Sequence, residues 1–404
     1  MLKVLVVYGT RPEAIKVAPV VGAMQASAHL VPVVAVTGQH RGMLDQVNAL
    51  FGIHPKHDLD IIRPRQTLEQ ITTSALEGVS AILDEEHPDA ILVQGDTTTC
   101  FAAALAAFYR KIPLVHLEAG LRTGDPYNPF PEELNRRLTT QLAAVHLAPT
   151  PTSKANLLAE GVMPSNVFVT GNTVIDALLD VVARDLPTDS SDLGRIGPRP
   201  FVLVTSHRRE SWGEPMASTA RALARLARAF PDVALVLPAH LNPAVREVLL
   251  PPLVGLENVI VTDPLAYGDF AKAMATCTLV LTDSGGVQEE APSLGKPVLV
   301  LRETTERPEA VAAGTVRLVG TDEDVIVTEV SQLLSNPVEY DAMARSVNPY
   351  GDGLASGRVV QAIENYFGLG PKPNDFRPAE STATSRSTAR SAPNEQRNHV
   401  GSSR

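Results

Sequence analysis

The sequence predicts an α/β protein with two doubly wound, Rossmann-like domains that face a cleft. Short apolar runs, typical of buried strands, alternate with longer helical patterns from the N-terminus onward. The alternation is interrupted by the Pro-, Gly-, Asp- and Ser-rich stretch 186–200 and resumes at 201. The chain has 404 residues, of which 44% are hydrophobic, and this is enough for two domains. Repeated βα units imply parallel sheets with helices on both faces.

The strands are predicted from runs rich in Val, Ile and Leu, and the helices from the longer segments between them. The strands of the first series are 3–8, 32–36, 90–93, 113–116, 145–148 and 167–170. The helices of the first series are 13–26, 40–51, 67–86, 98–109, 132–142 and 176–184. The strands of the second series are 201–205, 233–237, 258–261, 279–281, 297–301 and 315–319, and a last helix is 355–367.

These elements divide the chain into an N-terminal domain, 1–171, and a C-terminal domain, 172–354. We expect the last helix, within 355–368, to pack back on the first domain. Residues 369–404 are rich in Ser, Thr, Arg, Pro and Asn and carry almost no aliphatic side chains. Such a segment buries too little surface to fold, so we predict a disordered tail.

The overall composition excludes several classes of protein. The net charge of −10 argues against a nucleic-acid-binding protein, which usually has a basic face. Cys100 and Cys277 lie far apart in apolar runs, so we expect reduced core residues. The N-terminus enters a strand directly without a signal-peptide pattern, and no apolar run is long enough to span a bilayer. We therefore expect a cytoplasmic protein with no membrane partner.

The stretch 279–307 has the pattern of a diphosphate-binding turn. After an apolar strand the chain runs through Ser284-Gly285-Gly286 into a short helix. Free backbone N–H groups and the positive end of the helix dipole meet at such a point, which suits a phosphate. Glu290 is placed one turn later to accept hydrogen bonds from two ribose hydroxyls, and Arg307 is placed to bind phosphate. The alternative is a tight turn in which glycine serves only for its backbone freedom.

Charged side chains also follow the strands of the first series. These residues are Arg11, Lys16, Asp96 and Glu118, and Glu132 lies on the aromatic- and Pro-rich loop 122–133. A cation in the first helical turn opposes the helix dipole, which favours a ligand-binding role over a solvated one. Carboxylates that converge in a cleft raise each other's pKa and can supply a general acid and a general base. The alternative is a set of separate helix caps and surface carboxylates.

The second domain supplies His207, Arg208 and Arg209 after its first strand, which suggests a site that stabilises an anion; the alternative is a charged surface loop. His116, His146 and His240 do not have the spacing of metal ligands. The first βα turn also lacks the GxGxxG pattern of nicotinamide and flavin enzymes. We therefore expect neither a nicotinamide nor a required metal.

Nine motifs carry a family resemblance. They are Gly9–Lys16, Gly95–Thr99, Glu118–Gly124, Pro131–Glu133, Gly171–Ile175, His207–Glu210, His240–Pro243, Thr282–Arg307 and Asn348–Gly353. Through them the chain resembles the bacterial non-hydrolysing UDP-N-acetylglucosamine 2-epimerases over about residues 1–368. The resemblance implies a glycosyltransferase-B-like fold. It also implies interconversion of UDP-GlcNAc and UDP-ManNAc, which usually feeds cell-envelope polysaccharide, by a cytoplasmic enzyme that is commonly a homodimer.

The resemblance further implies a mechanism. A base removes the C2 proton of the sugar while UDP leaves, and UDP then adds back to 2-acetamidoglucal with a proton on the opposite face. The catalytic groups implied are Lys16, Asp96, Glu118, Glu132 and His207, and the carboxylate that acts as the base stays open. The residues implied to bind UDP are Arg11, Phe270, Ser284, Gly285, Gly286, Glu290 and Arg307.

Bacterial members of this family also bind UDP-GlcNAc at a regulatory site. The matching positions are Gln39, Arg65, Gln66, Glu133, Arg208 and His240. Gly42 departs from relatives that carry a longer polar side chain there, which puts the strength of regulation in doubt. Three other functions stay open: a glycosyltransferase of the same fold, a hydrolysing epimerase, and a nucleotide-sugar sensor without turnover.

Overall fold

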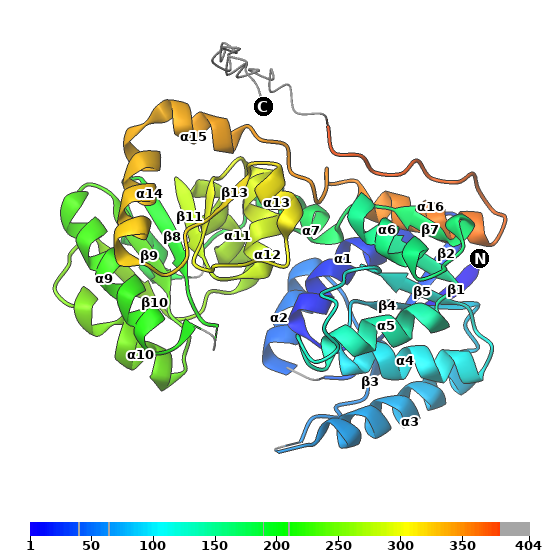
Figure 1. Cartoon of the computed structure of the whole chain (residues 1–404). Helices are drawn as coiled ribbons and strands as arrows, with labels where there is room; N and C mark the ends of the chain where they lie inside the picture. The colour runs from blue at the N-terminus through cyan, green and yellow to red at the C-terminus, as the bar shows by residue number, and fades with distance from the viewer. Residues whose placement is uncertain (39–40, 64, 189, 209–210, 380–404) are drawn as a thin grey trace, which may run out of the picture.

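The protein folds into two parallel α/β domains that lie side by side (Figure 1). The computed structural model describes residues 1–38, 41–63, 65–188, 190–208 and 211–379. Over these residues the first domain has a seven-stranded sheet of order β3-β2-β1-β4-β5-β6-β7, and the second a six-stranded sheet of order β10-β9-β8-β11-β12-β13. Every strand pairing in both sheets is parallel. The predicted fold class is confirmed.

The first domain is a three-layer arrangement around its sheet. Its strands are β1 (Leu2–Tyr8), β2 (Leu30–Val36), β3 (His57–Asp58), β4 (Ala90–Gln94), β5 (Leu114–Leu117), β6 (Val145–Ala148) and β7 (Val167–Val169). One face is covered by α1 (Arg11–Ala26), α2 (Arg41–Phe51), α7 (Thr173–Ala183) and α16 (Ala355–Tyr366). The other face is covered by α3 (Leu68–Glu86), α4 (Thr98–Tyr109) and α5 (Glu132–Leu142), and α6 (Pro151–Ala159) packs beside β7.

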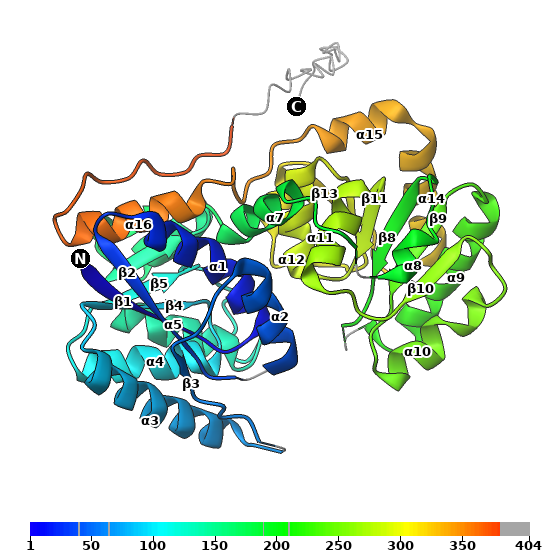
Figure 2. The ribbon, with the colours of Figure 1, turned by 180° about the vertical axis from the view of Figure 1, so that it is seen from behind.

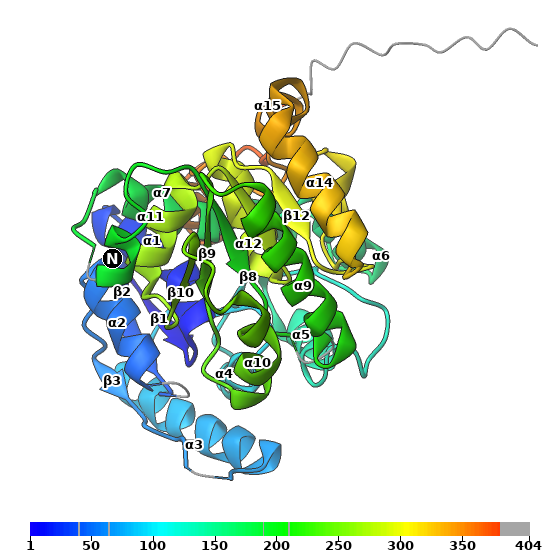
Figure 3. The ribbon, with the colours of Figure 1, turned by 90° about the vertical axis from the view of Figure 1, so that its left-hand side faces the viewer.

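The second domain repeats this plan. Its strands are β8 (Phe201–Thr205), β9 (Ala234–Pro238), β10 (Val259–Thr262), β11 (Leu279–Thr282), β12 (Val298–Val300) and β13 (Val316–Leu318). On its outer side α9 (Glu214–Ala229) lies against α10 (Pro243–Leu249) and α14 (Glu323–Ser335), as Figure 3 shows. Facing the first domain, α11 (Tyr267–Thr276) and α12 (Gly285–Glu290) contact α7. The remaining helices are α8 (Ser191–Gly194), α13 (Pro308–Ala312) and α15 (Pro337–Ala344).

The predicted strands and the predicted helices of the first domain agree with these bounds to within about three residues. Strand β3 is not among the predicted strands, because a two-residue strand has too few side chains to show a pattern. Among the described residues, no helix combines the length and the apolar character that a bilayer crossing requires.

Apolar packing continues from one domain into the other. In β1, Val4 and Val6 join one cluster of buried side chains and Leu5 and Val7 join another, because alternate residues of a strand face opposite sides of the sheet. The first cluster extends through α7 to buried side chains of α11 and α12. Two chain segments cross between the domains here, and the N–H of Asn172 in one donates to the carbonyl of Tyr350 in the other at 2.6 Å.

Residues 369–379 differ from the prediction that 369–404 is a disordered tail, and residues 380–404 lie outside the described residues. Figure 2 shows residues 369–379 as an orange-red segment that runs back past α16. The N–H of Phe376 donates to the carbonyl of Val169 at 2.7 Å, and the N–H of Val169 donates to the carboxylate of Asp375 at 2.9 Å. Lys154 also pairs with Asp375 at 2.6 Å, and Phe376 is only 3% exposed. One buried aromatic ring and one ion pair therefore attach this segment to the edge strand β7.

We predict that Phe376→Ala lowers the free energy of unfolding by about 3 kcal/mol, as expected when a buried aromatic side chain is removed. Urea denaturation would measure the change. Leu369→Ala is the control, because Leu369 is 42% exposed and its loss should cost less than about 0.5 kcal/mol. Equal stabilities of the two variants would show that the segment adds nothing to the fold.

Candidate functional site

The carboxyl ends of the strands in both sheets gather the predicted site residues around two adjoining cavities. The first cavity has a volume of about 400 Å³ and is lined by both domains. Its polar and aromatic lining includes Arg11, Lys16, Ser206, His207, His240, Tyr267, Phe270, Ser284, Gly286, Glu290 and Arg307. Parallel strands leave their following loops at one edge, so residues far apart in sequence meet there.

The predicted diphosphate-binding turn lies at the start of α12. Ser284 is the N-cap residue and its side chain makes no capping hydrogen bond. Gly285 is buried beneath two guanidinium groups: a Cβ atom built on it would lie 3.5 Å from Arg208 and 3.6 Å from Arg307. The first turn of α12 therefore offers backbone N–H groups with two arginines above them, which favours an anion.

Glu290 also lines the first cavity and accepts a hydrogen bond from the hydroxyl of Tyr267 at 3.2 Å. Burial raises the pKa of Glu290 to about 7, although the Tyr267 hydroxyl opposes the rise. The carboxyl group is therefore close to half ionised at neutral pH. A ligand that donates hydrogen bonds to it stabilises the ionised form.

His207 stands at the rim of the first cavity and is oriented by a buried carboxylate. Its Nδ1 lies 3.1 Å from Oδ1 of Asp283, which has no exposed surface. Oδ2 of Asp283 accepts the backbone N–H groups of His207 and Arg208 at 2.7 and 2.9 Å. Burial opposes the charge of Asp283, but these donors outweigh it and lower its pKa. Asp283 thus holds the imidazole with Nε2 available to a ligand.

The second cavity has a volume of about 280 Å³ and contains most of the predicted carboxylates. It shares Lys16 and Arg307 with the first. Nζ of Lys16 donates to both oxygens of Glu118, at 2.7 and 2.6 Å, and Gln94 donates to Glu118 as well. Burial alone would raise the pKa of Glu118, but Lys16 outweighs it and lowers the pKa. Glu118 also adopts a positive φ of 63°, which is rare outside glycine and typical of strained functional positions.

Asp96 has the opposite environment. Its carboxylate pairs with Arg136 at 2.7 Å, but burial outweighs this cation and raises the pKa of Asp96. The charge of Glu132 adds to the rise, so the three predicted carboxylates do interact. Glu132 is nevertheless not among the residues that line the second cavity. One carboxyl group with a lowered pKa and one with a raised pKa are the components of acid–base chemistry.

The predicted regulatory residues are only partly brought together. His240 lines the first cavity and stacks on His207, with ring centroids 6.3 Å apart. Glu133 is fully buried and accepts the N–H of Thr123, so its carboxylate holds the loop before α5. Arg208 follows His207 in the chain, reaches the start of α12 and lies 3.6 Å from Glu306. Arg65 and Gln66 lie apart from these residues, in the loop before α3, and Gln39, like Arg209, is outside the described residues.

Five residues with no predicted role contact the predicted groups in the structure: Asn172, Glu289, Asp283, Arg136 and Gln94. Asp283 and Glu289 stand beside predicted residues on the same turn and helix, and that adjacency was the available signal. Asn172 falls within the Gly171–Ile175 motif, but its contacts with Glu118 and Glu289 depend on tertiary packing. The contact of Arg136 with Asp96 depends on tertiary packing as well, so no local pattern reveals these contacts.

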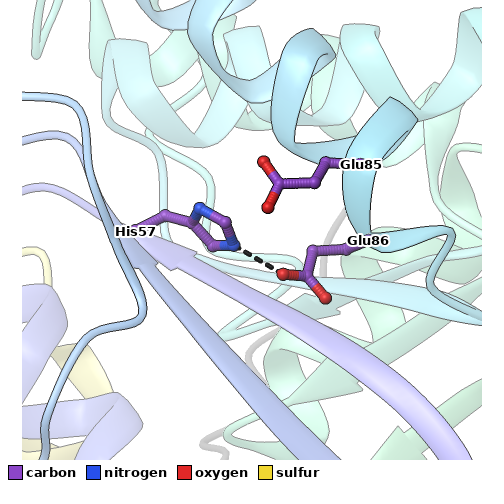
Figure 4. Close-up of side chains that lie close together, drawn as sticks. All are labelled: His57, Glu85 and Glu86. Carbon is purple, nitrogen blue, oxygen red and sulfur yellow. Dashed lines mark hydrogen bonds and ion pairs between the residues drawn. The ribbon is translucent and has the colours of Figure 1, made fainter.

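A further charged cluster lies at the edge of the first domain (Figure 4). It consists of His57, Glu85 and Glu86, whose ligand atoms lie within 4.8 Å of one another. Glu86 is already paired with Lys56 at 2.6 Å and with Lys3 at 3.2 Å. Its hydrogen bonds with Lys56 and His57 lower its pKa to about 2. The ammonium groups of Lys56 and Lys3 thus supply the positive charge that neutralises Glu86. The contacts of the cluster connect β3 with α3 and β1.

The fold and the paired cavities define a class: two-domain α/β proteins of glycosyltransferase-B-like architecture with an anion-accepting site between the domains. A family model described as UDP-N-acetylglucosamine 2-epimerase matches residues 22–364. The chain belongs to the UDP-N-acetylglucosamine 2-epimerase family.

Known relatives agree over almost the whole chain. The UDP-N-acetylglucosamine 2-epimerase of Escherichia coli (strain K12) is 54% identical over 371 residues, which is 90% of this chain and 99% of the relative. A solved structure of a putative member from Listeria monocytogenes is 47% identical, has a TM-score of 0.88, and the match covers 93% of this chain and 99% of that one. The structure from Neisseria meningitidis, bound to UDP-GlcNAc, is 47% identical with a TM-score of 0.82, over 90% and 100% of the two chains.

We predict that Lys16→Met destabilises the protein by about 3 kcal/mol at pH 8 and by less at pH 5. Without Lys16, burial raises the pKa of Glu118 above its unfolded value. The native state then binds more protons than the unfolded state, so stability falls as pH rises between the two pKa values.

Urea denaturation at both pH values would measure this difference. Lys272→Met is the matched control, because Lys272 and its partner Asp185 have 40% and 88% exposed side chains. Its loss should cost less than about 1 kcal/mol at either pH. A pH-independent loss in Lys16→Met would contradict the account of the buried pair.

Proposed function

We propose that this chain interconverts UDP-GlcNAc and UDP-ManNAc, without hydrolysis, by elimination and re-addition of UDP. The observation that carries the proposal is the junction of the two cavities at Lys16 and Arg307. A nucleotide diphosphate in the first cavity would place its sugar toward the carboxylates of the second. The relative from Neisseria meningitidis, described as bound to UDP-GlcNAc, supports the same ligand here.

In the proposed reaction a base takes the C2 proton, and the C2–H electrons form the double bond of 2-acetamidoglucal. The C1–O bond breaks, and its electrons go to the β-phosphate oxygen of UDP. Re-addition reverses these steps with a proton delivered to the other face of C2. Glu118, with its lowered pKa, fits the base, and Asp96, with its raised pKa, fits the acid. Glu132 acts on Asp96 through its charge.

The leaving group needs stabilisation of the negative charge that develops on it. Three cationic or donor groups of the first cavity supply this: Arg11, His207 and Arg307. The start of α12, at Ser284, Gly285 and Gly286, binds the diphosphate in this proposal. Glu290 accepts hydrogen bonds from the ribose hydroxyls, and Phe270 lies against the uracil ring. We propose that these groups suffice without a nicotinamide or a metal.

Epimerisation in D2O tests this proposal. Pure protein is incubated with UDP-GlcNAc without added metal or acceptor, and the products are monitored by proton NMR. The expected product is UDP-ManNAc with deuterium at C2. Asp96→Asn is the matched arm and should form no UDP-ManNAc, because the amide cannot deliver the proton to the opposite face of C2. Protium retained at C2 after turnover would rule out elimination. Free ManNAc would indicate the hydrolysing alternative, and unchanged substrate would favour a glycosyltransferase or a sensor.

The ionisation of Glu290 gives a second prediction. Because its pKa is raised to about 7, the carboxylate that accepts the ribose hydroxyls forms as pH rises through 7. The KM for UDP-GlcNAc should therefore fall from pH 6 to pH 8 in the wild-type protein. Glu290→Gln should raise KM at pH 8 by about tenfold and flatten this dependence. Glu257→Gln, at an exposed position, is the control and should keep the wild-type profile. An unchanged profile in Glu290→Gln would remove Glu290 from ribose binding.

Regulation by UDP-GlcNAc at the predicted second site, a homodimeric state, a cytoplasmic location and supply of UDP-ManNAc for cell-envelope polysaccharide stay predictions from the family resemblance. The stacking of His240 on His207 supports the first of these, because a ligand held by His240 would contact the imidazole that faces the diphosphate.

A further inference from the structure

A continuous line of polar contacts joins the two cavities through residues that line neither of them. At one end, Nε of Arg307 lies 2.5 Å from Oε1 of Glu289 on α12. The other carboxylate oxygen of Glu289 accepts a hydrogen bond from Nδ2 of Asn172 at 2.6 Å. Neither Glu289 nor Asn172 is among the residues that line the first or the second cavity. Arg307 is therefore held from behind, on the side away from a ligand.

The line continues into the second cavity. Nδ2 of Asn172 also lies 3.4 Å from Oε1 of Glu118, the oxygen to which Lys16 donates at 2.7 Å. An amide nitrogen carries two hydrogens, so Asn172 can donate to one carboxylate from each domain. The order of charges is cation, carboxylate, amide, carboxylate, cation. The amide separates two like charges that would otherwise repel across the domain boundary.

The line lies where the chain crosses between the domains. Asn172 directly precedes α7, and its N–H donates to Tyr350 of the second crossing segment at 2.6 Å. In that segment Nδ2 of Asn348 donates to the carbonyl of Glu289 at 2.9 Å. Both Asn172 and Glu289 are 3% exposed. Each contact in the line thus has a fixed position relative to both crossing segments.

Helix capping explains the hydrogen bond of the side-chain oxygen of Asn172 but not those of its side-chain nitrogen. Its Oδ1 accepts the N–H of Val174 at 3.1 Å, as an N-cap residue does. Ser and Asp serve about as well as Asn at the N-cap position, and Thr nearly so, but of these four side chains only Asn adds an amide donor. The two carboxylate contacts of Nδ2 are the property that capping does not explain.

We propose that Asn172 and Glu289 are positioning residues that hold Glu118 and Arg307 in one hydrogen-bonded line. Glu118, the carboxylate that acts at C2, and Arg307, the arginine that receives the diphosphate, thereby keep a fixed relative position across the domain boundary. This inference rests on the proposed function for the roles of its two ends. The contacts themselves involve no ligand.

Asn172→Asp tests the half of the line that ends at Glu118. The variant keeps the capping oxygen and replaces the donor by an acceptor, so Glu118 and Glu289 lose their shared partner. With UDP-GlcNAc as substrate, kcat should fall about 10- to 100-fold, the effect of losing a hydrogen bond to a charged group. KM and the affinity for UDP, measured by calorimetry, should stay within about threefold, because Arg307 keeps Glu289.

Asn172→Ser is the second variant, because it also keeps a capping oxygen and adds no charge. Asn336→Asp is the matched control: Asn336 caps α15 through its side chain and is exposed. It should keep the wild-type kcat. A kcat within about twofold of wild type in a folded Asn172→Asp or Asn172→Ser variant overturns the role of Asn172.

Glu289→Gln tests the other half by weakening the support of Arg307. Affinity for UDP should fall about tenfold, as a charge-assisted contact is lost, and unchanged affinity overturns this half. The double variant Asn172→Asp/Glu289→Gln exchanges amide and carboxylate, so that residue 289 can again accept from Arg307 and donate to residue 172. It should recover melting temperature lost in Asn172→Asp but not kcat, because Glu118 still faces an acceptor. Recovery of full kcat would contradict the proposal.

The wild-type D2O experiment separates this inference from the proposed function. A wild-type protein that binds UDP but exchanges no C2 proton refutes the proposed chemistry. The UDP affinity of Glu289→Gln still decides the Arg307 half in that case, because it requires no turnover.

Discussion

The compensation of buried charge at the domain boundary is the constraint on which the site depends. An isolated buried ion costs several kcal/mol, and removal of one partner from a buried pair is strongly destabilising. At the boundary two buried pairs of opposite charge form: Lys16 faces Glu118, and Arg307 faces Glu289. Because Asn172 contacts both carboxylates, the two pairs form one network. The placement of the domains and the ionisation of the site therefore depend on each other.

Topology brings these charges together. All strands in both sheets are parallel, so every loop that follows a strand emerges at the same edge of its sheet. The first domain supplies both carboxylates and cations at this edge, and the second supplies arginine, histidine and helix N–H groups together with Glu290 and Glu306. In the first cavity Arg11, Lys16 and Arg307 outnumber the lining carboxylates, although the whole chain has a net charge of −10. An acidic exterior and an anion-accepting cleft are compatible, because screening and distance separate the surface charges from the site.

The fold was predictable from sequence because buried parallel strands leave continuous apolar runs, and β3 was missed because two residues make no run. The charged ends of the site were predictable because strand-end positions such as Asp96 and Glu118 are visible in the sequence. The different environments of these carboxylates were not predictable. Burial raises the pKa of Asp96, whereas Lys16 lowers the pKa of Glu118, from which it is 102 residues away in the chain. Phe376 was missed because one aromatic residue in a polar tail does not outweigh the composition around it, yet its ring is buried.

The sharing of Lys16 and Arg307 by both cavities bears on the proposed reaction. Proton removal at C2 neutralises the base, and departure of UDP creates negative charge on the other side of the same cations. Lys16 faces Glu118 before the transfer, so protonation of that carboxylate leaves the ammonium less compensated. A less compensated cation attracts the departing phosphate more strongly, in the direction that elimination requires. In the proposed reaction, the cations that hold the base ionised at the start would thus also stabilise the leaving group at the end.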